Sequence, residues 1–552
     1  MAASIDRSVR FSLAPVWAYA CGVAAEFAPA NYSNWRHVAR DLAICLSLAN
    51  LLFVITAERL ETSYWVYVQN HPGWMSLAAF YVNVLLVGAA VWLVMLWVHR
   101  ARPGVVLKAV GIVFMLLALL ALKSAAHLSI LPEGTTTERL LTRAGVATLL
   151  IFAFLRFERL VRYTLTTILL ILSPLVPVDV ILATRNILFS TPETHASAPF
   201  NLHAAVPARV LILVFDEMDQ RLTFVTRPTG VRLPELDRLR SESFYASAAH
   251  APALFTLASM PAIITGRRIK AVTVRRDDLL LTYEGAASAV PWSGEPNLFR
   301  RARRVGANTG LVGWYHPYCR VLGGDLTTCV SVEGIFPDPS RFTDNFLDQY
   351  LSVDTTFARA LHLSMSMDRV YASRAYHQMH DTAIQVACDA RLQLVLLHWP
   401  TPHPPGIFDR QTHQFSTAGA VNYFDNLALA DQTLGELRRA LEGNGLSDRT
   451  AVIVTSDHHF RVGLWRHVYG LPKELEAATG GASQPLVPFL VHFGGRYRPA
   501  TYGAPFSGVL LHDLALAMLQ SKICGPEELS AWLDRNRAAV PLDGEWVSDR
   551  NF

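Results

Sequence analysis

Long apolar segments in the first third of the chain constrain its fold more than any other feature. Five of them occupy Leu42–Thr56, Trp74–Val98, Val105–Leu122, Ala144–Leu155 and Tyr163–Ala183. A helix needs roughly 20 apolar residues to cross a hydrocarbon core of about 30 Å. The second and fifth segments meet this length, the first and third are marginal, and the fourth is short. We therefore predict an α-helical membrane domain of about five spans. The earlier stretch Phe11–Ala30 carries Glu26 and two prolines, and we interpret it as interfacial or re-entrant.

The overall composition agrees with a membrane protein. Only 17% of the 552 residues are charged, whereas soluble chains carry about 25%. A net charge of +4 and the lack of a Lys/Arg-rich stripe argue against a nucleic-acid partner.

Basic residues predict the orientation of the spans, because loops rich in Arg and Lys stay on the cytoplasmic side. Arginines cluster before the first span and after the second and fourth: Arg7, Arg10, Arg36, Arg40, Arg100, Arg102, Arg156, Arg159 and Arg162. Everything after about Ala183 is then expected outside, whether or not Phe11–Ala30 spans. No cleavable signal peptide is evident. We expect a multi-pass protein of the bacterial inner membrane with a periplasmic domain.

Three regions follow from these patterns: a transmembrane domain over 1–184, a linker over 185–206 that is rich in proline and small residues, and a soluble domain over 207–552. In the soluble domain, short apolar runs predict buried strands at Val210–Phe215, Thr309–Gly313, Leu394–His398 and Ala451–Thr455. Helical patterns occupy Ser373–Arg391 and Tyr423–Leu441. This alternation predicts an α/β domain with a mostly parallel central sheet and helices on both faces.

Polar residues follow three of the predicted strands. Asp216 and Glu217 end the first, Asp457 and His458 come after Ala451–Thr455, and His403 follows Leu394–His398. Such residues would meet at the carboxyl edge of a parallel sheet. Carboxylate and imidazole are ligands that suit zinc, or manganese when oxygen dominates. An Asp at a strand end is also often only a helix cap, but three convergent ends favour a metal site.

A further segment, His250–Arg267, contains Thr256 with Ser259 and Pro261 three and five residues later, and Thr265-Gly266 beginning nine residues later. With these four segments, residues 207–525 resemble the alkaline phosphatase superfamily, which includes sulfatases, phosphodiesterases and membrane phosphoethanolamine and phosphoglycerol transferases. The spans resemble those of the transferase branch. Both spacings select Thr256 as the nucleophile that the resemblance implies.

The resemblance also implies a ligand set and a chemistry. The metal ligands would be Asp216, Glu217, Thr256, Asp457 and His458, although His459 stands where the family motif usually has glycine. His403 and His467 resemble transferase histidines that would hold the phosphate, protonate the leaving oxygen or bind a second ion. The divalent ion would be zinc, with manganese or calcium as alternatives. It would activate the Thr256 hydroxyl for an in-line displacement through a phospho-threonine intermediate.

The residues around Thr256 narrow the class of substrate but do not identify the substrate. Sulfatases resemble one another in a Cys or Ser that becomes formylglycine, followed by Pro and Arg, whereas Thr256 is followed by Ala258 and Met260 at those positions. Sulfate hydrolysis is thus disfavoured. The cysteines that flank the nucleophile in phosphoethanolamine transferases are replaced by Pro252 and Ala262. We expect transfer of a phosphoryl-linked group to a membrane lipid or envelope glycan. A hydrolase of a soluble ester and a non-catalytic envelope assembly protein are the alternatives.

The role of His316 and the pairing of the cysteines each allow more than one interpretation. His316, within an aromatic segment after the predicted strand Thr309–Gly313, would either line the pocket or pack in the core. Cys319 and Cys329 lie close enough in sequence to pair in an oxidising compartment. We expect Cys388 and Cys524 to be buried, with pairing as an alternative.

Overall fold

A computed structural model of the chain describes residues 35–54, 67, 74–101, 104–125, 136–189, 197–202, 206, 208–275, 278–332, 365–416, 421–466, 471–495 and 497–542. The stretch Phe11–Ala30, Cys21 and His467 lie outside the described residues. The chain divides into two compact units. One contains Met1–Val54 and Val84–Val178, and the other contains Ile55–Asn83 and Asp179–Phe552.

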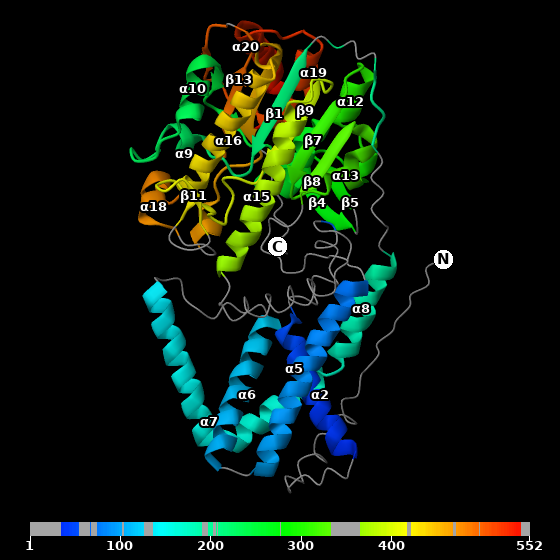
Figure 1. Cartoon of the computed structure of the whole chain (residues 1–552), viewed down its shortest axis with the longest axis vertical. Helices are drawn as coiled ribbons and strands as arrows, with labels where there is room; N and C mark the ends of the chain where they lie inside the picture. Colours follow the sequence, from blue (N-terminus) through cyan, green and yellow to red (C-terminus); the bar gives the residue numbers. More distant parts are fainter. Residues whose placement is uncertain are drawn as a thin grey trace, which may run out of the picture. The chain divides into compact units, whose positions relative to one another are not determined.

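The described residues of the first third of the chain are almost all helical, as predicted (Figure 1). Its helices are α2 (Trp35–Leu52), α5 (Trp74–Ala101), α6 (Gly104–Ala125), α7 (Thr136–Leu172) and α8 (Leu175–Phe189). Many large apolar side chains on them are exposed, which suits contact with lipid, including Leu85, Leu93, Trp97, Leu149 and Phe152.

Within the described residues, three segments rather than five are long and apolar enough to cross a membrane: Leu77–Trp97, Gly104–Lys123 and Ala144–Arg185. The predicted fourth and fifth spans fall within the third of these segments, where α7 has a non-helical residue at Phe157. The helix α2 is 18 residues long and carries the charged pair Arg40 and Asp41 in its second turn. Helix α8 continues to Phe189, past the predicted start of the linker at residue 185.

The second unit is built on an eight-stranded sheet with the order β14-β2-β13-β12-β1-β9-β7-β8. The strands are β14 (Ala500–Tyr502), β2 (Phe244–Ala246), β13 (Phe489–His492), β12 (Thr450–Ser456), β1 (Arg209–Phe215), β9 (Leu394–Trp399), β7 (Thr309–Trp314) and β8 (Thr328–Val332). All neighbours pair in parallel except β13, which runs antiparallel to β12 and β2. The four predicted strands and the mostly parallel sheet are confirmed.

Helices cover both faces of this sheet (Figure 1). The side chains of β1 alternate between the two faces and pack into two separate cores. Val210, Ile212 and Val214 face a core with α11 (Thr256–Thr265), α12 (Leu298–Arg304), α19 (Leu511–Leu519) and α20 (Pro526–Asn536). Leu211, Leu213 and Phe215 face a core with α10 (Pro234–Glu242), α15 (Met365–Ala387) and α16 (Tyr423–Gly443). The helices predicted at Ser373–Arg391 and Tyr423–Leu441 are confirmed as α15 and α16, with α15 shifted towards the N-terminus.

Shorter elements connect these layers. They are α9 (Gln220–Phe224), β3 (Ala249–His250), β4 (Ile269–Arg275), β5 (Asp278–Tyr283), β6 (Val290–Pro291), α13 (Tyr318–Leu322), β10 (Phe408–Asp409), β11 (Gln414–Phe415), α17 (Val462–Leu464), α18 (Lys473–Thr479) and β15 (Phe506–Ser507).

The cysteine expectations are met in part. Cys319 and Cys329 form a disulfide that joins α13 to β8. Cys388 is half-buried and Cys524 is exposed, and both are free, so the expectation that they are buried is wrong. The reason lies in their positions: Cys388 follows the end of α15, and Cys524 occupies the surface turn between α19 and α20.

Candidate active site

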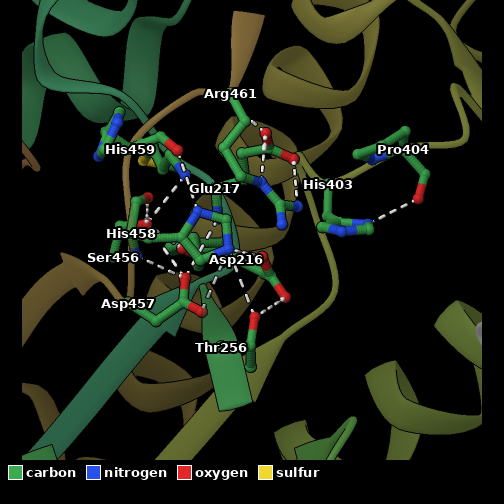
Figure 2. A network of polar contacts seen from close by, with 12 residues as sticks. Asp216, Glu217, Thr256, His403, Pro404, Ser456, Asp457, His458, His459 and Arg461 are labelled. Carbon is green, nitrogen blue, oxygen red and sulfur yellow. Dashed lines mark hydrogen bonds and ion pairs between the residues drawn. The ribbon is translucent and has the colours of Figure 1, made fainter. Parts of the chain in front are cut away.

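The candidate site lies at the carboxyl edge of the sheet, where β12, β1 and β9 are neighbours. Asp216 directly follows β1, and Asp457 and His458 directly follow β12. Thr256 begins α11, and Figure 2 shows its side chain directed at this group. All four side chains are buried. The convergence that the strand ends predict is therefore present in the structure.

Thr256 is fixed by the backbone that precedes it and by its own hydroxyl. Phe255 is extended and caps α11, so that Thr256 is the first helical residue. The Oγ1 atom of Thr256 donates a hydrogen bond to Oδ2 of Asp216 at 3.2 Å and lies 3.4 Å from Nε2 of His458.

The ring of His458 presents a lone pair to the two carboxylates. Its Nδ1 lies 2.9 Å from the carbonyl oxygen of His459, which can only accept, so Nδ1 carries the proton in the neutral ring. The Nε2 lone pair then faces Oδ1 of Asp216 at 3.3 Å and Oδ2 of Asp457 at 3.6 Å. Three acceptors in such proximity repel one another unless a cation or a shared proton lies between them.

The donor set fits a divalent metal. Ligand atoms around a tetrahedral ion with bonds of about 2.0–2.1 Å are separated by roughly 3.4 Å. The contacts of His458 Nε2 with Oγ1 of Thr256, Oδ1 of Asp216 and Oδ2 of Asp457, at 3.3–3.6 Å, are of this size. Oδ1 of Asp216 and Oδ2 of Asp457 accept no hydrogen bond from the described residues. Burial raises the pKa of Asp216 well above its usual range and that of Asp457 to about 6, as expected for carboxylates that need a cation.

A residue that the sequence interpretation missed, His398, also faces this site. Its Nδ1 bonds the Tyr318 hydroxyl at 2.9 Å, while its Nε2 has no hydrogen-bond partner among the described residues and lies 4.0 Å from Oδ2 of Asp216. Asp216, His398 and Asp457 each offer a ligand atom, all within 4.8 Å of one another. The signal was present in the sequence, because His398 is a polar residue in the apolar strand β9.

Glu217 lies beside the site, but its carboxylate is engaged elsewhere. The chain turns there, with a positive φ of 66°. Oε1 of Glu217 accepts hydrogen bonds from the backbone N–H of Arg461 at 2.9 Å and from its Nε at 3.2 Å. Burial alone would raise the pKa of Glu217, but the positive charge of Arg461, aided by His403 and His458, lowers it. Arg461 was not among the predicted residues.

Of the remaining predicted positions, the structure describes His403 and His459. His403 donates from Nδ1 to the Pro404 carbonyl at 2.7 Å (Figure 2), and burial lowers its pKa to about 3. His459 replaces the usual glycine without a positive φ, so a side chain is tolerated at this turn.

His316 lies behind Thr256. It is 2% exposed, and its Nε2 lies 3.0 Å from the carbonyl oxygen of Thr256. The sequence leaves two interpretations of His316 open, a pocket-lining residue or a core residue. Its burial agrees with packing in the core, but its hydrogen bond also links it to the backbone of Thr256. Gly313 makes room for the neighbouring Tyr318 ring, because a Cβ there would lie 2.6 Å from that ring.

A threonine at a helix start beside a buried Asp/His/Asp cluster, at the edge of a mostly parallel sheet, defines an enzyme of the alkaline phosphatase superfamily. The particular family follows from a comparison with family models. The chain belongs to the sulfatase family, whose model matches residues 208–520, more than half of the chain. Members of this family are divalent-metal-dependent enzymes.

Solved structures that resemble the chain include sulfatases and a lipoteichoic acid synthase. Ps i-CgsB in complex with a neocarrahexaose is 16% identical, with a TM-score of 0.41, over 57% of this chain and 73% of that chain. The sulfatase PsFucS1 from Pseudoalteromonas sp. is 15% identical, with a TM-score of 0.38, over 58% and 69%. The lipoteichoic acid synthase LtaP from Listeria monocytogenes is 14% identical, with a TM-score of 0.36, over 58% and 74%. At these identities the likeness concerns the fold alone. A comparison with curated proteins finds no match.

Proposed function

We propose that this chain is a membrane-anchored, metal-dependent phosphotransferase that moves a phosphoryl-linked group onto a membrane lipid or envelope glycan through Thr256. The observation that carries the proposal is a threonine hydroxyl hydrogen-bonded to one buried Asp at 3.2 Å and 3.4 Å from the Nε2 of His458. Threonine at this position is not a precursor of formylglycine, which favours phosphate over sulfate esters.

The proposed ion is zinc, held by Asp216, Thr256, Asp457 and His458, with Glu217 adjoining them. When bound, it would supply positive charge that favours the ionised threonine oxygen and offsets charge on the phosphoryl group. Mn²⁺ or Ca²⁺ would serve the same purpose.

In the first step, Oγ1 of Thr256 forms a bond to phosphorus, and the bond from phosphorus to the leaving oxygen breaks. The Thr256 proton moves along the hydrogen bond that it already makes to Asp216, and the leaving alcohol acquires a proton from solvent. The product is a phosphodiester-linked or phosphorylated Thr256, according to the donor.

In the second step, the acceptor hydroxyl gives its proton to a base and forms the new oxygen–phosphorus bond. The bond from phosphorus to Oγ1 of Thr256 breaks, and Oγ1 takes back the proton held by Asp216. His403 is a candidate base, because its Nδ1 donates to Pro404 and its neutral ring therefore presents Nε2 as an acceptor. A sugar or lipid hydroxyl gives transfer, and water gives hydrolysis. For His467 we keep the roles that the resemblance implies, which are to hold the phosphate, protonate the leaving oxygen or bind a second ion.

The class of acceptor follows from the proposed anchoring. With an inner-membrane helical region and the sulfatase-like domain in the periplasm, a membrane lipid or envelope glycan is the acceptor that we propose. The three apolar helices that are long enough to span support the membrane anchoring.

The test uses the full chain in detergent, incubated with bis(4-nitrophenyl) phosphate or a phosphoethanolamine lipid carrying a labelled head group. Intact mass and peptide mapping should find an adduct on Thr256 that is absent in Thr256→Ala. Thr265→Ala is the matched control, because Thr265 lies in the same helix and bonds the Pro261 carbonyl instead. Label in an acceptor lipid supports transfer, whereas label in water-soluble phosphate supports a hydrolase.

Two outcomes would contradict the proposed nucleophile. One is an adduct that persists in Thr256→Ala and disappears in Ser259→Ala, since Ser259 lies one turn further along α11 with a buried hydroxyl. The other is turnover of 4-nitrophenyl sulfate without turnover of either phosphodiester. A metal-free chain with neither adduct nor turnover would favour the non-catalytic alternative.

A further inference from the structure

Tyr67 lies far from the sulfatase-like domain in sequence but within the same compact unit. It belongs to Ile55–Asn83, which follows α2 in the chain and groups with Asp179–Phe552. Its side chain is completely buried and forms part of the core that contains α11. We propose that Tyr67 is a positioning residue for the nucleophile and acts on Thr256 through His316. This inference rests on the proposed function of Thr256.

The hydrogen bonds define one direction of proton donation. Nε2 of His316 lies 3.0 Å from the carbonyl oxygen of Thr256, which can only accept, so this nitrogen is the donor. With the proton on Nε2, the other nitrogen of a neutral ring, Nδ1, is an acceptor. The Tyr67 hydroxyl lies 2.9 Å from Nδ1 and therefore donates to it. Tyr67 thus selects the tautomer that bonds to Thr256.

Tyr67 is itself held in place. Arg320 donates from Nη2 to its backbone carbonyl, and the guanidinium lies 5.7 Å from the centre of its ring. The Trp292 ring meets the His316 ring edge to face at 5.1 Å, and the Tyr67 ring does so at 5.9 Å. The imidazole therefore has little room to turn.

The hydrogen bond reaches the backbone of the reacting residue. Because Thr256 begins α11, movement of its carbonyl rotates the first turn and shifts Oγ1 relative to Asp216. A misplacement of about 1 Å can reduce the rate of an enzyme by about 100-fold. Without the Tyr67 hydroxyl, His316 can adopt the other tautomer, in which two lone pairs oppose each other at 3.0 Å.

The experiment compares Tyr67→Phe with Tyr376→Phe in the full chain. Tyr376 is a matched control, because it is also buried with a bonded hydroxyl, to Thr433, but lies in the other core. We expect Tyr67→Phe to lower kcat for the phosphodiester by about 10- to 100-fold with little change in KM. Amide exchange over 256–265 should become faster in Tyr67→Phe, while exchange in β12 stays unchanged.

Two variants of His316 separate positioning from packing. The side-chain nitrogen of glutamine can occupy the place of Nε2 and still donate to Thr256, whereas asparagine is too short. His316→Gln should therefore retain more of the kcat than His316→Asn.

The proposal is overturned if Tyr67→Phe leaves both kcat and exchange in α11 unchanged, or if it acts no differently from Tyr376→Phe. If the wild-type chain turns over no phosphodiester, the proposed function fails, but the exchange comparison still decides whether Tyr67 positions the helix.

Discussion

Nε2 of His458 lies 3.3 Å from Oδ1 of Asp216, and neither side chain is exposed to solvent. Since Nδ1 of His458 is directed at the carbonyl of His459, the facing nitrogen carries a lone pair. A buried lone pair opposite a buried carboxylate needs a cation or a shared proton between them. This pair supports the proposed metal site, which also includes the neighbouring group of Asp216, His398 and Asp457.

Loss of Asp457, a proposed metal ligand, should abolish metal-linked stabilisation. Asp457→Asn keeps Oδ1, which accepts from the backbone of Glu217 and His458, but places an amide opposite the His458 ring. We expect metal affinity to fall by more than about 100-fold, because even outer-shell partners contribute about 10–100-fold. A chelator should lower the Tm of the wild-type chain and leave that of Asp457→Asn unchanged. Asp425→Asn serves as the control, and equal metal content in all three proteins would refute this assignment.

His398 should influence the metal although it lies within a strand. We expect His398→Asn to weaken metal binding by about 10–100-fold and to change the visible spectrum of the Co²⁺-substituted protein. His512→Asn removes a comparably buried ring that bonds the Ile264 carbonyl, and should do neither. An unchanged spectrum and affinity in His398→Asn would show that this ring only packs against Tyr318.

The Glu217–Arg461 pair should contribute to folding stability. Arg461→Gln leaves a fully buried carboxylate without its partner, which costs about 3–5 kcal/mol. Adding Glu217→Gln should restore part of this free energy of unfolding, because the uncompensated charge is then gone. The exposed pair Arg238–Glu242 is the comparison, and Arg238→Gln should cost no more than about 1 kcal/mol. Equal losses in the two single variants would contradict the burial argument, as measured by chemical denaturation.

Asp431 should make stability fall between about pH 4 and pH 7. Its buried carboxylate accepts the N–H groups of Leu236 and Glu235 at the start of α10, and burial raises its pKa to about 7. An unfolded Asp titrates near about 3.9, so in this interval the folded state binds more protons and stability decreases as pH rises. Asp431→Asn should flatten the dependence of Tm on pH in this range.

Asp389 is the control for the dependence of Tm on pH, because its pKa is shifted in the opposite direction. Hydrogen bonds from Arg391 lower its pKa, so its stabilising contribution is lost only as pH falls below about 4. Asp389→Asn should leave the slope between pH 4 and 7 as it is in the wild-type chain. Identical slopes in wild-type and Asp431→Asn proteins would exclude the assigned role of Asp431.

Strand positions and convergence at the sheet edge were predictable for local reasons. Continuous apolar runs specify β1, β7, β9 and β12, because buried parallel strands need apolar side chains on both faces. Residues after parallel strands lie at one edge, and this places Asp216 beside Asp457. The number of spans was harder to predict from the sequence. Hydropathy does not reveal the interruption at Phe157 or where α8 ends.

The sequence by itself determined the two-part organisation, the mostly parallel sheet, and Thr256 with its Asp and His neighbours, because these depend on short-range patterns and spacing. Only the tertiary structure decided that His398 faces the carboxylates, that Arg461 takes the carboxylate of Glu217, and that Tyr67 reaches Thr256 through His316. Residues 67 and 316 are 249 positions apart. Contacts over such separations depend on how whole layers pack, and no local pattern encodes them.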